Sequence, residues 1–331
     1  MKKQIVTYLL VAAFMLFSTV PALAKTTWNA NSVWPPGNHQ TQALEEFAGL
    51  VKDMTNGELE ILVSSGGALG FQGPELLVVV RDNIVPVSDM LISGVAGQED
   101  IFGVVTLPFL AHDFEEARLL NEIARPHFDE VAEKWNQKIL YISPWPGAGV
   151  WTKRKIESIQ DMRGLKARTY DKNGALVIEA TGGTPYALPF SEVYSSLATG
   201  MIDSVVTSTP TAVDANFWEV LDYYQPLNIT IATNMVNVNL RAFNRLDEKT
   251  QQALVEAGKQ MEQIMWDKVA ELDREKENIS NEKGIETIAV SDELMNALTE
   301  ITAGIRKEYL DSASPESRKI VDTFLEEVGR K

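Results

Sequence analysis

Residues 188–203 read Leu-Pro-Phe-Ser-Glu-Val-Tyr-Ser-Ser-Leu-Ala-Thr-Gly-Met-Ile-Asp. Ser191 is a typical N-terminal cap and Gly200 a typical helix stop, so this stretch predicts a helix between them. A short apolar strand is predicted directly after it, at Ser204–Thr207. A helix that leads into a buried strand in this way is characteristic of α/β folds.

Outside this stretch, apolar strands and amphipathic helices alternate along the whole chain. Expected helices cover residues 39–55, 74–81, 113–135, 171–181 and 247–283, and two more begin at Ser291 and Ser314. Expected strands cover residues 26–30, 59–63, 84–91, 139–143, 165–169, 204–207, 229–240 and 285–290. No Pro-rich linker separates two halves, so we expect an α/β protein whose lobes share crossing strands and helices.

The composition excludes several classes of protein. The chain has 331 residues, enough for about two domains. It carries 46 acidic and 30 basic side chains, and the net charge of −16 does not favour nucleic-acid binding. The absence of cysteine excludes disulfides, thiolate metal sites and cysteine nucleophiles. The three histidines, His39, His112 and His127, are not spaced as a zinc motif, so neither a metal nor a cofactor is predicted.

The first 24 residues have the pattern of a secretory signal peptide. Lys2 and Lys3 precede an apolar run of 16 residues at 5–20, and Ala22-Leu23-Ala24 offers small residues for cleavage. The alternative, a membrane anchor, needs ~20 apolar residues. We therefore expect cleavage after Ala24 and a freely soluble, exported mature chain. Loss of the two lysines changes its net charge from −16 to −18.

The sequence contains no motif that supports catalysis. GxSxG, HExxH, a P-loop and a complete GxGxxG are all absent, and no catalytic residue is predicted. Adjacent carboxylates such as Glu45 and Glu46 lie on charged helical patterns and point in different directions. An exported enzyme acting on a small organic acid, and a periplasmic ligand sensor, remain alternative interpretations of the function.

Three segments together resemble a known family of transport proteins. They are Asp161–Arg168 (Asp-Met-Arg-Gly-Leu-Lys-Ala-Arg), Leu188–Asp203, and Leu107–Leu110 (Leu-Pro-Phe-Leu). The chain resembles the substrate-binding proteins of tripartite ATP-independent periplasmic (TRAP) transporters, of the dicarboxylate-binding (DctP) type. The resemblance implies a two-lobed, class II-like periplasmic binding protein with crossing strands and a long inter-lobe helix. It also implies a periplasmic location, a small organic anion as ligand, and the small and large membrane subunits of a TRAP transporter as partners.

The same resemblance divides the chain into a leader and two lobes. Residues 1–24 form the expected signal peptide. Residues 25–146 with about 235–273 form the first lobe. Residues 147–234 with about 274–331 form the second lobe.

The resemblance also implies that Arg168 pairs with a ligand carboxylate. This arginine ends the Gly-Leu-Lys-Ala-Arg motif at 164–168. A guanidinium fork matches a planar carboxylate and stays charged at every relevant pH. In so acidic a protein, an organic anion needs a local positive site of this kind. The alternative is an exposed arginine at the end of a strand.

Other ligand contacts are transferred from the family position by position. Phe190 matches the aromatic residue that packs on the ligand. Thr207 falls where the family has an asparagine, so the hydroxyls of Thr207 and Ser208 are expected to replace an amide. Ala148 falls where sialic-acid-type members carry a second arginine, which argues against dicarboxylic and sialic acids. Monocarboxylates, aromatic or indole-type acids, oxo acids and small sulfonates remain open.

Several residues beside strand ends are expected in the cleft. Aromatic walls would suit a ligand with an apolar or flat body, and the alternative for each tryptophan is packing in the core between the lobes. The residues expected in these loops are Trp34, Ser93, Trp145, Trp151 and Asn234.

Overall fold

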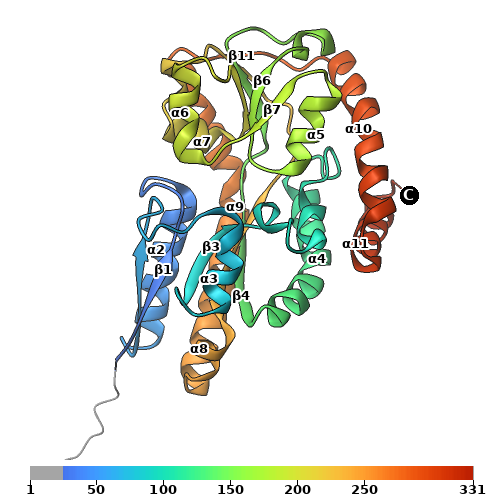
Figure 1. Ribbon diagram of the computed structural model, residues 1–331. Helices are drawn as coiled ribbons and strands as arrows, with labels where there is room; N and C mark the ends of the chain where they lie inside the picture. Colours follow the sequence, from blue (N-terminus) through green and yellow to red (C-terminus); the bar gives the residue numbers. More distant parts are fainter. Residues whose placement is uncertain (1–24, 331) are drawn as a thin grey trace, which may run out of the picture.

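The computed structural model describes residues 25–330, which form two lobes, each built around its own sheet (Figure 1). The lobe I sheet has the order β2 (Leu59–Ser64), β1 (Thr26–Asn31), β3 (Val87–Leu91), β10 (Thr233–Asn239), β4 (Gln137–Pro144). The lobe II sheet has the order β11 (Glu286–Thr287), β9 (Tyr223–Gln225), β5 (Gly149–Thr152), β8 (Ser204–Thr207), β6 (Lys166–Thr169), β7 (Thr184–Ala187). This arrangement confirms the predicted two-lobed α/β fold.

Helices cover both sheets. Lobe I carries α2 (His39–Met54), α3 (Leu76–Arg81), α4 (Phe114–Lys134), α8 (Leu240–Asn244) and the 3₁₀ turns η2 (Ser93–Val95) and η3 (Asp100–Thr106). Lobe II carries α5 (Lys172–Ala180), α6 (Phe190–Ala198), α7 (Thr209–Asp214) and α10 (Asp292–Ser312). Helices were expected to begin at Asp113, Asp171, Asp247 and Ser291, and each of these side chains caps its helix by accepting a hydrogen bond from the first turn.

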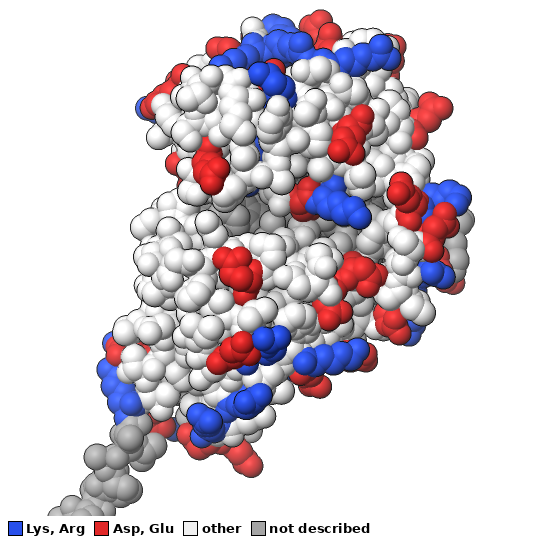
Figure 2. Space-filling model, in the orientation of Figure 1, with Lys and Arg blue, Asp and Glu red and all other residues white. Residues whose placement is uncertain are grey.

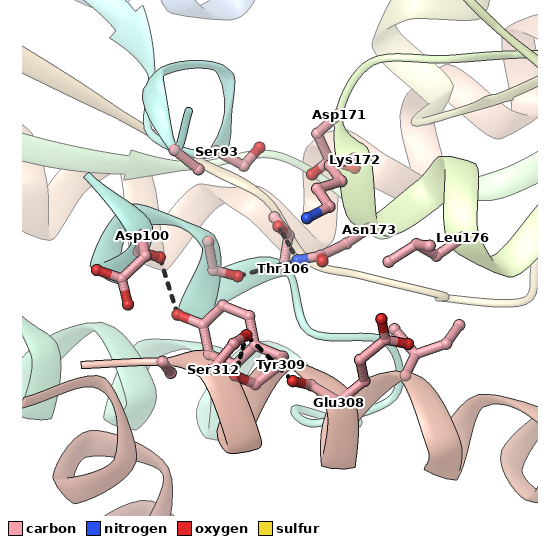
Figure 3. A pocket seen from close by; sticks show the side chains of 14 residues that line it. Ser93, Asp100, Thr106, Asp171, Lys172, Asn173, Leu176, Glu308, Tyr309 and Ser312 are labelled. Atoms are coloured by element: carbon pink, nitrogen blue, oxygen red, sulfur yellow. Dashed lines mark hydrogen bonds between the residues drawn. The ribbon is translucent and has the colours of Figure 1, made fainter. Parts of the chain in front are cut away.

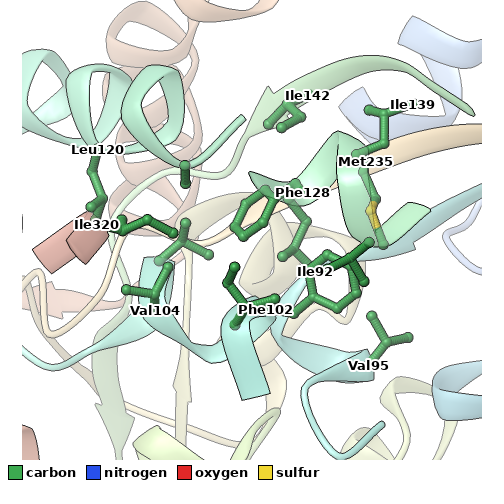
Figure 4. Packing of buried hydrophobic residues seen from close by; sticks show 14 of the residues in the cluster. Ile92, Val95, Phe102, Val104, Leu120, Phe128, Ile139, Ile142, Met235 and Ile320 are labelled. Atoms are coloured by element: carbon green, nitrogen blue, oxygen red, sulfur yellow. The ribbon is translucent and has the colours of Figure 1, made fainter. Parts of the chain in front are cut away.

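Apolar clusters lie on both faces of the lobe I sheet. Phe102 and Phe128 pack at the centre of one of them, with ring centroids 5.3 Å apart, and Met235 of the crossing strand β10 contacts the same cluster (Figure 4). Phe47 of α2 and Tyr141 of β4 pack on the opposite face, 5.4 Å apart. Since β10 is buried along its whole length between these layers, it is firmly held in lobe I.

The chain crosses between the lobes four times. It crosses after β4, before β10, along α9 (Glu248–Glu282), and between α10 and α11 (Pro315–Glu327). Helix α9 packs on β4 and α2 in lobe I and on α7 in lobe II, which confirms the long inter-lobe helix. Phe109 braces the crossings: its backbone N–H donates to Ile229 O at 2.9 Å, and its ring lies in a lobe II cluster. Its φ of 53° is rare for a bulky residue and marks a constrained position.

Three details differ from the sequence predictions. Helix α11 packs on α4 of lobe I, because its buried Ile320, Val321 and Phe324 complete the lobe I core, whereas residues after about 274 were expected in lobe II. Residues 233–234 likewise pair with lobe I strands as the start of β10. Helix α6 begins at Phe190 with Pro189 as its cap, two residues before the expected cap, Ser191. The predicted signal peptide lies outside the described residues.

Candidate functional site

Two connected cavities lie between the lobes. The inner chamber has a volume of about 30 Å³ and is lined by Trp34, Leu91, Trp145, Pro146, Ala148, Arg168, Tyr170, Thr207, Ser208, Thr211 and Ala232. The outer groove, of about 660 Å³, shares Trp34, Leu91, Arg168 and Tyr170 with the chamber and continues along Phe190 and the Gly66–Leu76 region. Figure 2 shows the molecule hollowed between the lobes, with most charged side chains on the outer parts of both.

Arg168 lies where the two cavities meet. It sits near the end of β6, paired with Tyr186 of β7 and Val205 of β8, so the sheet fixes its backbone. Only 5% of the residue is exposed, and its Nε donates to Leu188 O at 3.0 Å. Burial lowers the pKa of Arg168 to about 10, and the nearby Tyr170 and Asp171 oppose that fall, so the group stays charged at neutral pH.

No carboxylate within residues 25–330 forms a salt bridge with Arg168. Buried charges are normally paired, because an isolated ion is costly to remove from water. The guanidinium therefore has hydrogen-bonding capacity left for an anion that enters from either cavity.

Hydroxyl groups form the lobe II wall beside Arg168. Thr207 ends β8, and Ser208 follows it directly before α7. Ser208 Oγ and Thr211 Oγ1 lie 3.3 Å apart, and both residues line the inner chamber together with Thr207. These groups can donate to or accept from polar atoms of a ligand, which is the role expected for Thr207 and Ser208.

Aromatic side chains form the opposite wall. The rings of Trp34 and Trp145 meet edge to face with centroids 4.6 Å apart. Trp34 also lies 6.1 Å from the ring of Phe190, which reaches toward it from lobe II. Trp145 Nε1 donates to Asn234 Oδ1 at 2.7 Å, and its backbone N–H donates to Ala232 O at 2.8 Å. The wall is therefore assembled from both lobes but fixed mainly in lobe I.

The glycines on either side of Ala148 are required by close backbone packing. A Cβ at Gly147 would lie 2.0 Å from Asn228 Oδ1, and one at Gly149 would lie 2.3 Å from Gln225 O. Ala148 N donates to Thr230 O and Ile229 N donates to Ala148 O, both at 2.8 Å. Two crossing segments thus pair tightly beneath the chamber, and Ala148 leaves that part of its wall without a charge.

Two of the three predicted site residues that lie outside the chamber are buried behind its walls. Trp151 is fully buried in the lobe II core, stacked on Tyr224 with centroids 4.0 Å apart, and its Nε1 donates to Thr207 O at 3.1 Å. It supports the chamber wall from behind because alternate residues of β5 face opposite sides of the sheet. Asn234 is also fully buried and contacts Trp145 from behind.

Ser93 lies in a neighbouring side cavity rather than in the chamber (Figure 3). This side cavity has a volume of about 180 Å³ and lies between η2 and η3 of lobe I and α5 and α10 of lobe II. Asn173 bridges the lobes there, since its Nδ2 donates to Gly103 O at 3.0 Å and to Thr106 Oγ1 at 3.1 Å. The side cavity therefore marks a contact that holds the lobes together.

Other chamber residues were not predicted from the sequence. Tyr170 and Thr211 line the chamber, and Asp89 lies fully buried on β3 next to Asn234. Tyr170 is two residues beyond Arg168, so the end of the same strand could have indicated it. Apart from its neighbour Ser88, Asp89 sits in an apolar stretch at 84–92, and a lone acid in a buried strand is a usable signal.

Among residues 25–330, no group of three or more histidine, aspartate or glutamate side chains is placed to hold a metal ion. His39 is buried, with its Nε2 at 3.4 Å from Pro144 O, and burial lowers its pKa to about 3. In the same range of the chain, no helix combines the length and apolarity needed to cross a bilayer.

Comparison with known proteins agrees with this geometry. The model of bacterial extracellular solute-binding protein family 7 matches residues 30–312. The chain belongs to this family. Its members among the solved structures include TRAP-type solute receptors, so the resemblance noted in the sequence is confirmed.

Three relatives of this family 7 protein cover nearly the same length. A Bordetella pertussis extracytoplasmic solute receptor, described as binding pyroglutamic acid, is 29% identical over 90% of this chain and 99% of its own, with a TM-score of 0.88. A marine-metagenome TRAP solute-binding protein described as specific for pyroglutamate is 27% identical over 91% and 99%, with a TM-score of 0.87. The 2,3-diketo-L-gulonate-binding periplasmic protein of Escherichia coli is 26% identical over 91% of this chain and 94% of its own.

Proposed function

We propose that this family 7 protein captures a small organic anion between its lobes and delivers it to the small and large membrane subunits of a TRAP transporter. The observation that carries the proposal is Arg168, a buried guanidinium without a carboxylate partner at the junction of both cavities. Family membership supports the same role. The anchor of the anion is then the fork of Arg168, and the lobes enclose the rest of the ligand.

The lining favours a compact monocarboxylate. Arg168 is the one charged residue among those that line the inner chamber, so a second ligand carboxylate would find no cation there. The hydroxyls of Thr207, Ser208 and Thr211 suit polar ligand atoms, and the tryptophans suit a flat or apolar body. Pyroglutamate, the described ligand of two relatives, combines one carboxylate with a small lactam ring and is the first probe to test.

Binding requires movement of the lobes or of the tryptophans. The inner chamber, at about 30 Å³, has room for a water molecule or two and not for an organic acid. The ligand then enters from the outer groove while the lobes stand further apart, and its contacts with both walls favour closure. The transporter can read this closed state as the signal of occupancy.

We also propose export to the periplasm with cleavage after Ala24, as the sequence pattern indicates. The family's extracytoplasmic location supports export, and the cleavage site is the finer part of the proposal. Mass spectrometry of periplasmic material should give an N-terminus at Lys25. A chain that retains Met1 in the membrane fraction would contradict it.

A thermal-shift screen against organic acids tests the function. Pyroglutamate, sugar acids, short aliphatic acids and sulfonates should be compared on the mature chain and on Arg168→Ala. Arg163→Ala is the matched control, because Arg163 lies in the same motif but is exposed. We expect at least one acid to raise the melting temperature of the wild type and of the control, and to be recovered unchanged. Stabilisation of Arg168→Ala to the same extent would refute the anchor, and turnover of the acid would favour the enzyme interpretation.

A further inference from the structure

A hydrogen-bonded chain of three residues runs behind the aromatic wall, and a fourth residue, Trp34, lies beside its end. Trp145 Nε1 donates to Asn234 Oδ1, and Asn234 Nδ2 donates to Asp89 Oδ1, both at 2.7 Å. Trp34 completes the set, because its indole acts on the Asp89 carboxylate and opposes the rise of its pKa that burial causes. We call these four residues the Asp89 network. They lie on or just beyond β1, β3, β10 and β4, which are consecutive neighbours in the lobe I sheet.

The Asp89 network is buried, and the hydrogen bond that could join Trp34 Nε1 to Asp89 Oδ2 is not formed. Asp89 and Asn234 have no exposed surface. Asp89 Oδ2 and Trp34 Nε1 are both buried, and neither has closed a hydrogen bond of ordinary geometry. Buried polar atoms without partners are costly, so a small rotation of Trp34 that closes this contact is favoured.

We propose that Asp89 is a positioning residue that holds both tryptophans of the aromatic wall. It holds Trp145 through Asn234 and Trp34 directly. The proposal rests on the proposed function only in taking the chamber as the ligand site. Asp89 touches no ligand itself, since it does not line either cavity. Its effect is on the shape that the ligand meets.

The hydrogen-bond roles of its neighbours indicate that Asp89 holds the two tryptophans in its charged form. Both groups facing Asp89, the Asn234 amide and the Trp34 indole, are donors, and an ionised carboxylate only accepts. Asparagine at this position would keep the volume but turn an NH₂ group toward one of the two donors. Asp89→Asn should therefore release one of the two tryptophans and keep the other in place.

Burial works against the charged form. It raises the pKa of Asp89 to about 7, and the donors Asn234 and Trp34 oppose that rise. Tyr141 of β4 faces the same region, and burial raises its pKa far above the neutral range. His39 of α2 contacts Trp145 edge to face, and its lowered pKa of about 3 keeps it neutral. Glu46 of α2 acts on Tyr141, and Lys276 of α9 acts on His39, where its charge helps to lower the pKa.

Near-ultraviolet circular dichroism of the tryptophans tests the proposal without any ligand. Between pH 5 and 9, the wild-type signal should change with a midpoint near 7, and Asp89→Asn should show no such change. Asn234→Ala should alter the spectrum at every pH, since it frees Trp145. Asn237→Ala is the matched control: Asn237 is equally buried on β10, but it bonds Gln137, away from the chamber. Its spectrum should match the wild type.

Titration with pyroglutamate and with acetate provides the second measurement. Asp89→Asn and Asn234→Ala should weaken pyroglutamate by about fivefold to tenfold, the effect of one lost hydrogen bond, and leave acetate unchanged. Spectra of both variants that coincide with the wild type at every pH would overturn the proposal. If neither acid binds the wild type, the proposed ligand class fails, while the spectra still decide the role of Asp89.

Discussion

The two walls of the cleft differ in what they hold. The lobe II wall carries the charge: Arg168 and the hydroxyls of Thr207 and Ser208 project from the ends of neighbouring strands. The lobe I wall carries Trp34 and Trp145 and presents no charge to the chamber. One lobe therefore supplies attraction for an anion and the other supplies shape. We therefore expect selectivity to depend on both walls.

The largest expected effect comes from removing the charge. Arg168→Ala should weaken the identified acid by about 10²–10⁴-fold, on the order of 3–5 kcal/mol, because a buried carboxylate loses its bidentate partner. Arg168→Lys should recover little, since an ammonium does not reproduce the planar fork. Isothermal titration calorimetry measures both, with Arg163→Ala as control. A loss of affinity below about threefold in a folded Arg168→Ala variant would contradict the role of Arg168 as the anion anchor.

Removing one tryptophan of the aromatic wall should weaken binding less, and by an amount that depends on the ligand. Trp145 is 4% exposed, so Trp145→Ala should cost about 3–5 kcal/mol of unfolding free energy. Its binding effect should depend on the ligand: pyroglutamate should lose about tenfold to a hundredfold and acetate only a few fold, because the ring loses its aromatic contact. Chemical denaturation and calorimetry separate the two effects. Equal losses for both acids would make Trp145 a core residue only.

The buried acid behind the lobe I wall should make stability depend on pH. An aspartate titrates near 3.9 when unfolded, and the pKa of Asp89 is raised to about 7 in the fold, so the native state holds the extra proton between these values. Its contribution to stability is then lost as pH rises from about 4 to 7, by on the order of 3–4 kcal/mol in all. Burial lowers the pKa of His39 to about 3, which has the opposite sign in nearly the same window.

Only a difference between variants can separate these two groups. The unfolding free energy of wild type minus that of Asp89→Asn should fall steadily between pH 4 and 7 in urea denaturation. The same difference for Asn237→Ala should stay flat. A flat difference for Asp89→Asn as well would mean that Asp89 does not titrate in this window.

The smallest expected effect comes from the contact between the lobes. Asn173 donates to Gly103 O and Thr106 Oγ1, and Asn173→Ala should weaken binding by about threefold to tenfold through a less favourable closed state. Small-angle scattering should show a larger radius of gyration than the wild type without ligand and the same value at saturation. Lys172→Ala, an exposed neighbour, is the control. Identical profiles for both variants would remove Asn173 from the closure mechanism.

Local signals in the sequence predicted most helices and strands, but not which of them pack against one another. The caps at Asp247 and Ser291 predicted the starts of α9 and α10, because capping depends on residues within one turn. The placement of α11 in lobe I was not predictable, since its apolar face would suit either core. Periodicity describes the face of a helix and not the surface that it meets.

The residues of the site were likewise predictable only in part. Arg168 and Phe190 follow from motif positions, and the structure brings both to the cleft. Trp151 was expected in a loop but lies in the core, because a one-residue alternation along β5 decides which side a residue faces. Asp89 was missed because its importance comes from Asn234, 145 residues away in the sequence.

The four crossings limit how the lobes can move. Two of them are hydrogen-bonded segments beneath the chamber, the third is the continuous helix α9, and the fourth is the turn between α10 and α11 on the side of the molecule away from α6 (Figure 1). Four such connections restrict how the two lobes can move relative to each other. We therefore expect the ligand-free protein to sample a narrow range of lobe arrangements. Closure costs correspondingly little entropy, and more of the contact energy appears as affinity.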